Sequence, residues 1–152
     1  MTTNANTNFG QRLEMGDDDA TLELIAELIE VTPPTLSRNF TDVTTHDSAR
    51  DADGGVPQEF IPDEIYDPGE MTFKINYVEG SDATEDLITA YGARAKKLFR
   101  LVGKGAGTTS RFIKGYAYIS SFAPDSRPVN GVQTATVTLK RTGVWTRGVV
   151  TA

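Results

Sequence analysis

Apolar side chains recur at every second position in two segments of this chain, and this alternation limits the folds that it can adopt. In residues 71–77, methionine, phenylalanine, isoleucine and tyrosine alternate with polar residues. In residues 134–139, Ala135, Val137 and Leu139 alternate with three threonines. Successive side chains of a strand point to opposite faces of its sheet, so a period of two predicts strands with one buried face. The chain is therefore expected to be mainly β.

One further segment has the pattern of a short helix. Ser81 or Asp82 can cap a helix, Glu85 follows at the spacing of a capping box, and an apolar stripe ends near Gly92. We expect a helix over residues 82–92. With strands around it, the chain is predicted to form a β-sandwich or barrel-like fold flanked by one short helix. The other expected strands are 9–15, 97–102, 111–122 and 132–142.

Residues 22–31 fit two patterns. Their apolar residues match both a helical stripe and a strand alternation. Pro33 and Pro34 push the residues before them toward extended geometry, which slightly favours the strand. Periodicity alone leaves the choice open.

Composition indicates one soluble acidic domain. The 152 residues have 15 Lys and Arg against 21 Asp and Glu, a net charge of −6, and no cysteine. A chain of this length can bury a core without disulfides or metals. Residues 1–80 hold 17 acidic and 4 basic residues, a net −13, whereas residues 81–152 hold 4 and 11, a net +7. The asymmetry predicts an interaction surface of each sign. We expect no leader peptide and no membrane span.

Two segments lack a regular apolar pattern. Residues 1–8 are rich in Thr and Asn and are expected to form a flexible arm. Residues 41–68 contain three prolines and many aspartates and are expected to be a long loop. Its apolar residues are too many for a solvated linker, so part of it is expected to dock on a partner, such as another subunit. They are Phe60, Ile61, Ile65 and Tyr66.

The sequence contains no convincing catalytic or metal-binding motif. A Ser-His-Asp triad would depend on His46, the only histidine, which is better interpreted as a turn residue. Asp47, Asp51 and Asp53 lack the spacing and closing Glu of a calcium loop. Residues 103–109 lack Walker spacing and are expected to connect two strands. An acid–base pair could in principle be found among four neighbouring carboxylates, but only their abundance supports it. They are Glu59, Asp63, Glu64 and Asp67. We therefore expect no enzyme, cofactor or metal site.

Several segments follow one another in a fixed order: FGQRLEMGD (9–17), IAE (25–27) through LSR (36–38), TDVTTHDS (41–48), EFIP (59–62), DPGEMTF (67–73), and TATVTLK (134–140) with TG (142–143). Together they resemble the lambda-type major tail tube proteins of siphophages and related tailed particles. The blocks span roughly residues 9–143, and the combination of phrases is more specific than any one of them. The chain departs from the family pattern at Asp63, where Gly is frequent, and in the loop 49–58. No immunoglobulin-like C-terminal domain is expected.

The resemblance implies a fold, an assembly and a set of partners. It implies a tail-tube β-sandwich with one helix, in which residues 24–31 form a strand. Six subunits would form a ring, and stacked rings would form a non-contractile tube that conducts double-stranded DNA without binding it tightly. A tape-measure protein, a tail terminator and distal tail or baseplate proteins would be further partners. The protein would be made in the bacterial host cytoplasm and reside in the virion tail.

The resemblance and the charge split together suggest contact and lumen residues. The long loop would reach another subunit or ring through apolar anchors and acidic groups. An acidic lumen would avoid holding DNA phosphates. The lumen candidates are Glu27, Glu30 and Glu70, and the contact candidates are Phe9, Asp42, His46, Asp47, Phe60, Ile61, Ile65 and Tyr66.

Two alternative functions stay open at this point. The first is a tube protein of a gene transfer agent or of a contractile, secretion-type machine. The second is a monomeric β-sandwich that binds a carbohydrate or another ligand. Only Trp145 and the five tyrosines suggest the latter, and aromatic residues in strands more often belong to the core.

Overall fold

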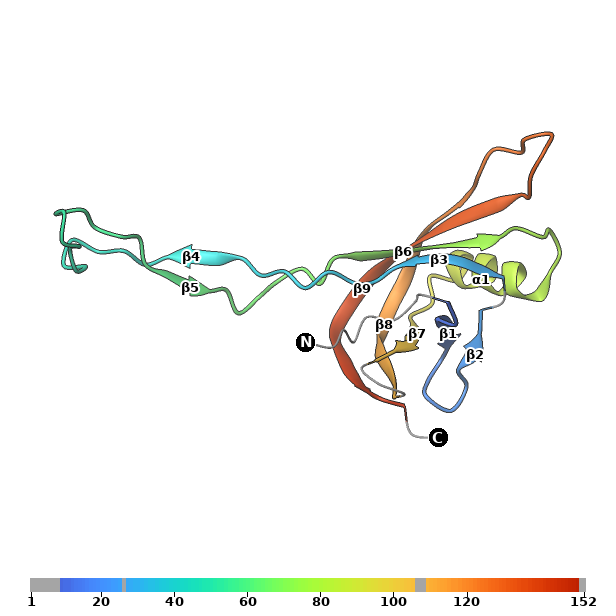
Figure 1. Ribbon diagram of the computed structural model, residues 1–152. Helices are drawn as coiled ribbons and strands as arrows, with labels where there is room; N and C mark the ends of the chain where they lie inside the picture. The colour runs from blue at the N-terminus through green and yellow to red at the C-terminus, as the bar shows by residue number, and fades with distance from the viewer. Residues whose placement is uncertain (1–8, 26, 106–108, 151–152) are drawn as a thin grey trace, which may run out of the picture. The chain divides into compact units, whose positions relative to one another are not determined.

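The computed structural model describes residues 9–25, 27–105 and 109–150, which divide into two compact units. The sandwich unit comprises the chain up to Thr35 and from Gly69 onward. The hairpin unit comprises Leu36–Pro68. Figure 1 labels the elements of both. The flexible arm expected for residues 1–8 lies outside the described residues.

The sandwich unit is built on one antiparallel seven-stranded sheet. Its strand order is β2-β1-β7-β8-β9-β6-β3, so strands from both ends of the chain are interleaved. The strands are β1 (Arg12–Gly16), β2 (Glu23–Leu24), β3 (Leu28–Thr32), β6 (Glu70–Asn76), β7 (Lys97–Lys104), β8 (Ser110–Pro124) and β9 (Thr134–Val149).

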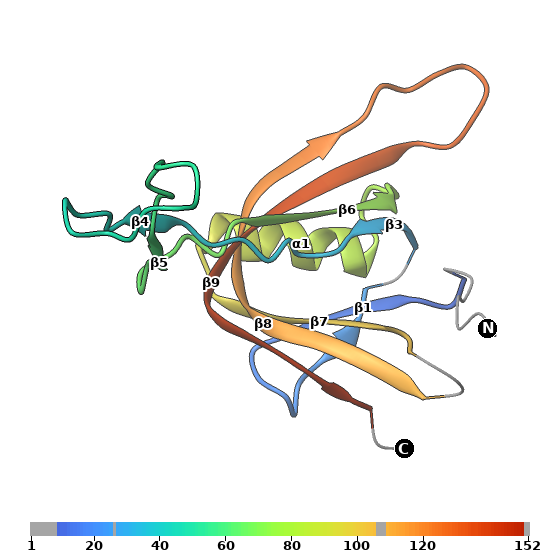
Figure 2. The same ribbon diagram turned by 60° about the vertical axis from the view of Figure 1, so that its left-hand side comes forward.

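Two long strands carry this sheet through both layers of the sandwich. The first half of β8 pairs with β7, whereas residues 119–124 pair with the start of β9. The start of β9 also pairs with β6, and residues 141–149 pair back with β8. The β8–β9 register shifts between Lys114 and Tyr116 and between Ile119 and Ser121. Such bulges bend strands, and Figure 2 shows both strands curving from one layer into the other.

The alternation predicted from the sequence generates the core. Met71, Phe73 and Ile75 of β6 are 1–2% exposed, and Ala135, Val137 and Leu139 of β9 are fully buried. Intervening threonines and Lys74 lie on the opposite face. The predicted mainly β sandwich with one helix is confirmed. The structure adds that its two layers are parts of one bent sheet.

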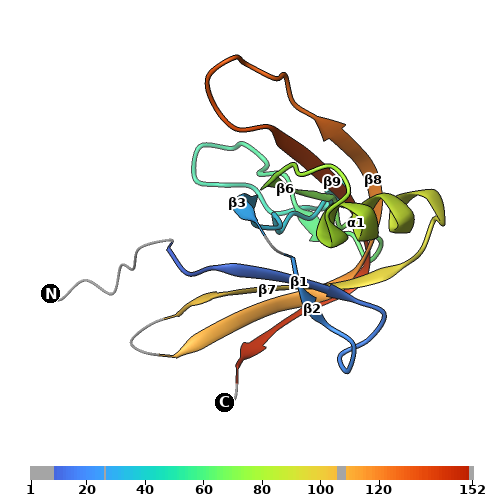
Figure 3. The ribbon, with the colours of Figure 1, turned by 90° about the vertical axis from the view of Figure 1, so that its right-hand side faces the viewer.

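The single helix of the described residues, α1 (Asp82–Gly92), contributes to the same core. Leu87 and Ala90 face the strands and are buried. Figure 3 shows α1 lying between the two layers at one side of the sandwich. Ser81 is the N-cap but makes no side-chain capping bond, and the amide of Glu85 donates to its carbonyl at 2.9 Å. The helix therefore has the expected range without the expected capping box.

Residues 24–31 do not form the single strand that the resemblance implied. β2 pairs with β1, whereas β3 pairs with β6 on the far side of the sheet order. The chain must change layers between them. Glu27, with a φ of 63°, lies in this crossing, and its carbonyl accepts a bond from the Asn76 amide at 2.9 Å. This crossing breaks the pattern, which explains why periodicity gave two answers.

Residues 41–68 are also more regular than the expected loop. β4 (Phe40–Asp42) pairs with β5 (Phe60–Pro62) as an antiparallel hairpin. Two further backbone bonds extend the ladder, from Val43 to Glu59 at 2.8 Å and from Asp63 to Asn39 at 2.9 Å. Three-residue strands are too short to show an alternation in the sequence, which is why the hairpin was missed.

Replacing Leu87 by Ala should destabilise the sandwich unit. Its side chain is fully buried in the hydrophobic core, so the loss should be about 2–5 kcal/mol in the free energy of unfolding. Urea unfolding followed by circular dichroism measures this. The matched control Ile88→Ala removes a side chain that is 38% exposed on the next helix position and should change stability by about 0.5 kcal/mol or less. Equal losses in both variants would contradict the packing of α1.

Candidate functional site

The hairpin unit has no interior of its own. None of its residues is buried. Its strands place large apolar side chains in solvent, where monomeric proteins rarely gather them. A surface of this kind is typical of contact with another chain. The exposed apolar residues are Leu36, Phe40, Val43, Val56, Phe60, Ile61, Ile65 and Tyr66, of which Ile65 is 90% exposed.

The hairpin unit brings together seven of the eight predicted contact residues. Phe60 and Ile61 lie in β5, directly opposite Asp42 and Thr41 of β4. His46 and Asp47 lie in an exposed turn, and Ile65 and Tyr66 follow β5. Phe9 belongs instead to the sandwich unit, where it is 87% exposed.

The net charge of the chain is confined to one of the two units. The hairpin unit has eight Asp and Glu against two Arg, a net −6. The remaining 13 acidic and 13 basic residues balance. All of the net charge of the chain therefore belongs to Leu36–Pro68.

Hydrogen bonds hold some of the hairpin carboxylates in place. The amide of Thr44 donates to Asp42 at 2.8 Å, and hydrogen bonding by Thr44 lowers the pKa of Asp42. Asp51 accepts from the amides of Asp53 and Gly55 at 3.0 and 2.9 Å, which closes a turn. Within the described residues, no group of three or more acidic or histidine side chains could hold a metal ion. Asp51 thus acts as a turn residue.

The three lumen candidates lie on one polar face of the sandwich unit. Glu30 is opposite Lys74 and Glu70 is opposite Lys140 in neighbouring strands. Glu27 accepts a bond from the Asn76 side chain at 2.9 Å. All three carboxylates are exposed. They border a threonine-rich surface that faces away from the core, formed by Thr32, Thr72, Thr134, Thr136 and Thr138.

Asp125 joins this polar face and was missed in the sequence. It accepts from the Thr134 hydroxyl at 2.6 Å and lies 3.5 Å from the ammonium of Lys74. The Thr134 bond, opposed by desolvation and assisted by Lys74, lowers the pKa of Asp125. A carboxylate in a turn gives no sequence signal of such a network.

A second missed residue, Arg141, contacts the two residues that flank the hairpin unit in the sequence. It is only 5% exposed, and its guanidinium lies 5.0 Å from the ring centroid of Trp145. Its side chain donates to the Thr35 carbonyl and its amide to the Gly69 carbonyl, both at 3.0 Å. Thr35 and Gly69 directly flank the hairpin unit. Arg141 therefore ties both of these flanking residues to β9.

Trp145 is a structural residue. It packs against the core, its indole nitrogen donates to the Tyr116 carbonyl at 3.0 Å, and a Cβ at Gly115 would lie 2.3 Å from its ring. Only glycine allows this approach. The ring is therefore placed for packing, which removes the main sequence argument for a carbohydrate-binding platform.

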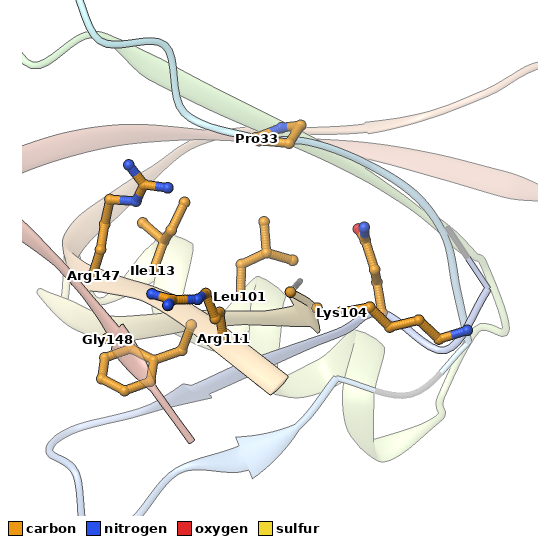
Figure 4. Close-up of a pocket in the computed structure, with 11 residues that line it drawn as sticks. Pro33, Leu101, Lys104, Arg111, Ile113, Arg147 and Gly148 are labelled. Carbon is orange, nitrogen blue, oxygen red and sulfur yellow. The ribbon is translucent and has the colours of Figure 1, made fainter. Parts of the chain in front are cut away.

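A cavity of about 310 Å³ opens in the sandwich unit. Figure 4 shows Pro33 across this cavity from Leu101, Arg111 and Ile113. Three of its lining residues are cationic, namely Lys104, Arg111 and Arg147, and none of the lining residues is acidic. The sequence gave no reason to group these residues.

No helix in the described part of the chain is long and apolar enough to cross a membrane.

Comparison with solved structures identifies proteins of the same fold. A chain in the "Tail of empty GTA particle computed with helical refinement, C6 symmetry" aligns with a TM-score of 0.67 and 14% identity over 93% of this chain and 98% of that one. A chain in the "Virion of native gene transfer agent (GTA) particle" gives 0.65 and 14% over 95% and 99%.

A chain from a contractile particle is also similar. It belongs to an "Extracellular Contractile Injection System, PVC sheath-tube complex in extended state" and aligns with a TM-score of 0.58 and 15% identity over 91% of this chain and 89% of that one. No family model and no curated protein matches the sequence. At these identities the likenesses show the fold, and the lambda-type siphophage resemblance stays a prediction.

Replacing Asp125 by Asn should lower stability only where the native carboxylate is charged. A carboxylate whose pKa is lowered on folding stabilises the native state above its ordinary value of 3.8, and the effect is lost as the pH falls through the lowered pKa. The Tm of Asp125→Asn should therefore lie below that of the parent at pH 7 and approach it below about pH 3.8. Thermal unfolding across this range measures it. Asp86→Asn, exposed on α1, controls for the loss of one negative charge.

Proposed function

We propose that this protein is the structural subunit of a tail tube. Six copies form a ring, and rings stack into a hollow tube that conducts double-stranded DNA from a tailed particle. In this role the chain is a building block and not an enzyme. The single observation that carries the proposal is the hairpin unit, which has no buried residue and exposes apolar anchors beside eight carboxylates.

The fold comparisons support this role. The likeness to a chain in the GTA tail covers 93% of this protein, which leaves little of the chain for another module. That tail has C6 symmetry and was treated as helical, which are the symmetries of stacked six-fold rings. We therefore assign this chain a six-fold ring that repeats along an axis. The tube would reside in the virion tail after synthesis in the bacterial host cytoplasm.

The threonine-rich face suits the wall of a DNA channel. With Glu27, Glu30, Glu70 and Asp125 against Lys74 and Lys140, it has a net charge of −2. Each cation that binds a phosphate adds affinity through counterion release, so excess carboxylates let DNA pass. The short threonine side chains of this face do not project far enough to hold the DNA. We assign this face to the lumen, where a tape-measure protein would lie before DNA passes.

The particle type is a separate question. The resemblance of the sequence phrases favours a non-contractile siphophage or gene transfer agent tail, whose tube ends would contact terminator and distal tail or baseplate proteins. The runner-up is the tube of a contractile machine, favoured by the likeness to a chain of a sheath-tube complex. A sheath gene beside the gene for this protein would select the runner-up.

Electron microscopy of the purified protein over a range of concentrations tests the proposal. The expected result is rings with six-fold symmetry and tubes built from them. A protein that stays monomeric at millimolar concentration, and also when tail initiator proteins are added, would overturn the proposal.

Replacing Phe60 by Ala should raise the protein concentration required for tube formation. Phe60 is 54% exposed, so its loss should leave the Tm of the monomer unchanged. Truncating a buried interface anchor costs about 2 kcal/mol, which corresponds to about 30-fold in concentration. Sedimentation followed by microscopy measures the threshold. The matched control Ile88→Ala removes an exposed apolar side chain from the sandwich unit and should assemble like the parent. An unchanged threshold for Phe60→Ala would exclude this anchor.

A further inference from the structure

The cavity of the sandwich unit has an unusual floor. Leu101 of β7 pairs with Ile113 of β8, and Ile113 pairs with Arg147 of β9, so the three form one row across the layer. The next row contains Gly103 opposite Arg111. Leu13, which pairs with Leu101, belongs to the core, so these rows lie on the core-facing side of the layer.

At the cavity, this core-facing side carries arginines where the rest of the side carries apolar residues. The inner face of β9 begins with Ala135, Val137 and Leu139, and the same phase of the strand reaches Trp145 and Arg147. Gly103 has no side chain to fill the space beside Arg111, so the cavity remains open there. The result is a cavity with an apolar base and a cationic rim at Lys104, Arg111 and Arg147.

The charges of this rim differ from those of the rest of β7 and β8. Lys97 pairs with Asp17 at 2.6 Å, and Lys114 pairs with Asp19 at 3.0 Å. Arg100 contacts the buried Glu14 through its Nε at 2.7 Å. Among the described residues, neither Arg111 nor Arg147 has an ion pair. The cavity therefore presents two guanidinium groups that have no carboxylate partner within residues 9–25, 27–105 and 109–150.

The hairpin unit has the complementary chemistry. It carries the −6 charge of the chain, and it places Ile65, which is 90% exposed, beside Glu64. An apolar side chain with a neighbouring carboxylate matches an apolar base with an arginine rim. A carboxylate can receive two parallel bonds from one guanidinium, which adds orientation to the contact. Each copy carries this hairpin unit and this cavity in the part of the chain that the structure describes, so copies can be joined in equal numbers.

We propose that the cavity lined by Leu101, Arg111, Ile113 and Arg147 is the docking site for the hairpin unit of a second copy of this chain. Ile65 enters the apolar base, and neighbouring carboxylates meet the two arginines. This inference rests on the proposed tube and names the surface that its subunits use. The contact is head-to-tail, because the surface that a copy offers differs from the surface that it uses as receptor.

Reversal of the cavity charges tests the electrostatic part. Arg111→Glu with Arg147→Glu should raise the protein concentration needed for assembly by at least about tenfold, because like charges would then face each other. The matched control reverses Arg94 and Arg127, two exposed arginines outside the cavity, and gives the same net charge. The control should assemble like the parent. Thermal unfolding verifies that both variants fold. An equal effect in both, or none in the cavity variant, would overturn the proposal.

Disulfide trapping tests the contact directly, because the chain has no cysteine of its own. One chain carries Ile113→Cys and a mass-tagged chain carries Ile65→Cys, so a heterodimer can only join two copies. The expected result is rapid formation of this heterodimer under mild oxidation. The control replaces Ile113→Cys by Glu85→Cys on the exposed side of α1 and should cross-link at least about tenfold more slowly.

The two proposals fail in different ways. Tubes without the Ile65–Ile113 cross-link would overturn the docking site and leave the tube function standing. The cross-link without rings or tubes would support the docking site and overturn the tube. A chain carrying both cysteines that closes only on itself as a monomer would show that the cavity binds its own hairpin unit, which would overturn docking by a second copy.

Discussion

The pairing between β8 and β9 is the interaction on which the rest of the structure depends. These strands belong to both layers, so every other strand of the sandwich is joined to them directly or through one or two neighbours. Their register shifts bend the sheet without changing which face of β9 looks inward. One face of a single strand therefore carries core residues, the side chain of Arg141 that contacts Thr35, and Arg147 of the cavity rim.

The hairpin unit obeys a different constraint. A two-stranded hairpin is marginally stable alone, and this one has turn and ladder hydrogen bonds but no buried side chain. Its concentrated negative charge makes two hairpin units repel each other, whereas a surface with exposed cations attracts them. The charge distribution thus favours contact between a hairpin unit and a sandwich unit of another copy. Hairpin-to-hairpin association, which the exposed apolar residues alone would permit, is disfavoured.

Sequence reasoning succeeded where a pattern was long and local. The alternation in β6 and β9 and the apolar stripe of α1 each extend over at least six residues, so their periods are legible. It failed at Glu27, where the chain changes layers, and at β4 and β5, whose three residues are too few for a period. The apolar content of the hairpin unit and the basic character of residues 81–152 were visible in the sequence, but the grouping of Arg111 and Arg147 at one cavity was not. Arg111 and Arg147 become neighbours only through the β8–β9 register.

The arginines of β9 show what such a register can encode. Arg141 and Arg147 share the inward phase of one strand, six residues apart, yet their environments differ. Arg141 is buried, donates to the Thr35 carbonyl and lies against Trp145, so these contacts are made within one chain. Arg147 lies at the cavity rim, where none of the lining residues is acidic. In the proposed assembly, one face of β9 thus contacts Thr35, which precedes the hairpin unit in the same chain, and binds the hairpin unit of another copy. Because that contact is not self-complementary, a pair of copies leaves one hairpin unit and one cavity unused. Further copies can therefore add until a ring closes, or can add without limit along a tube.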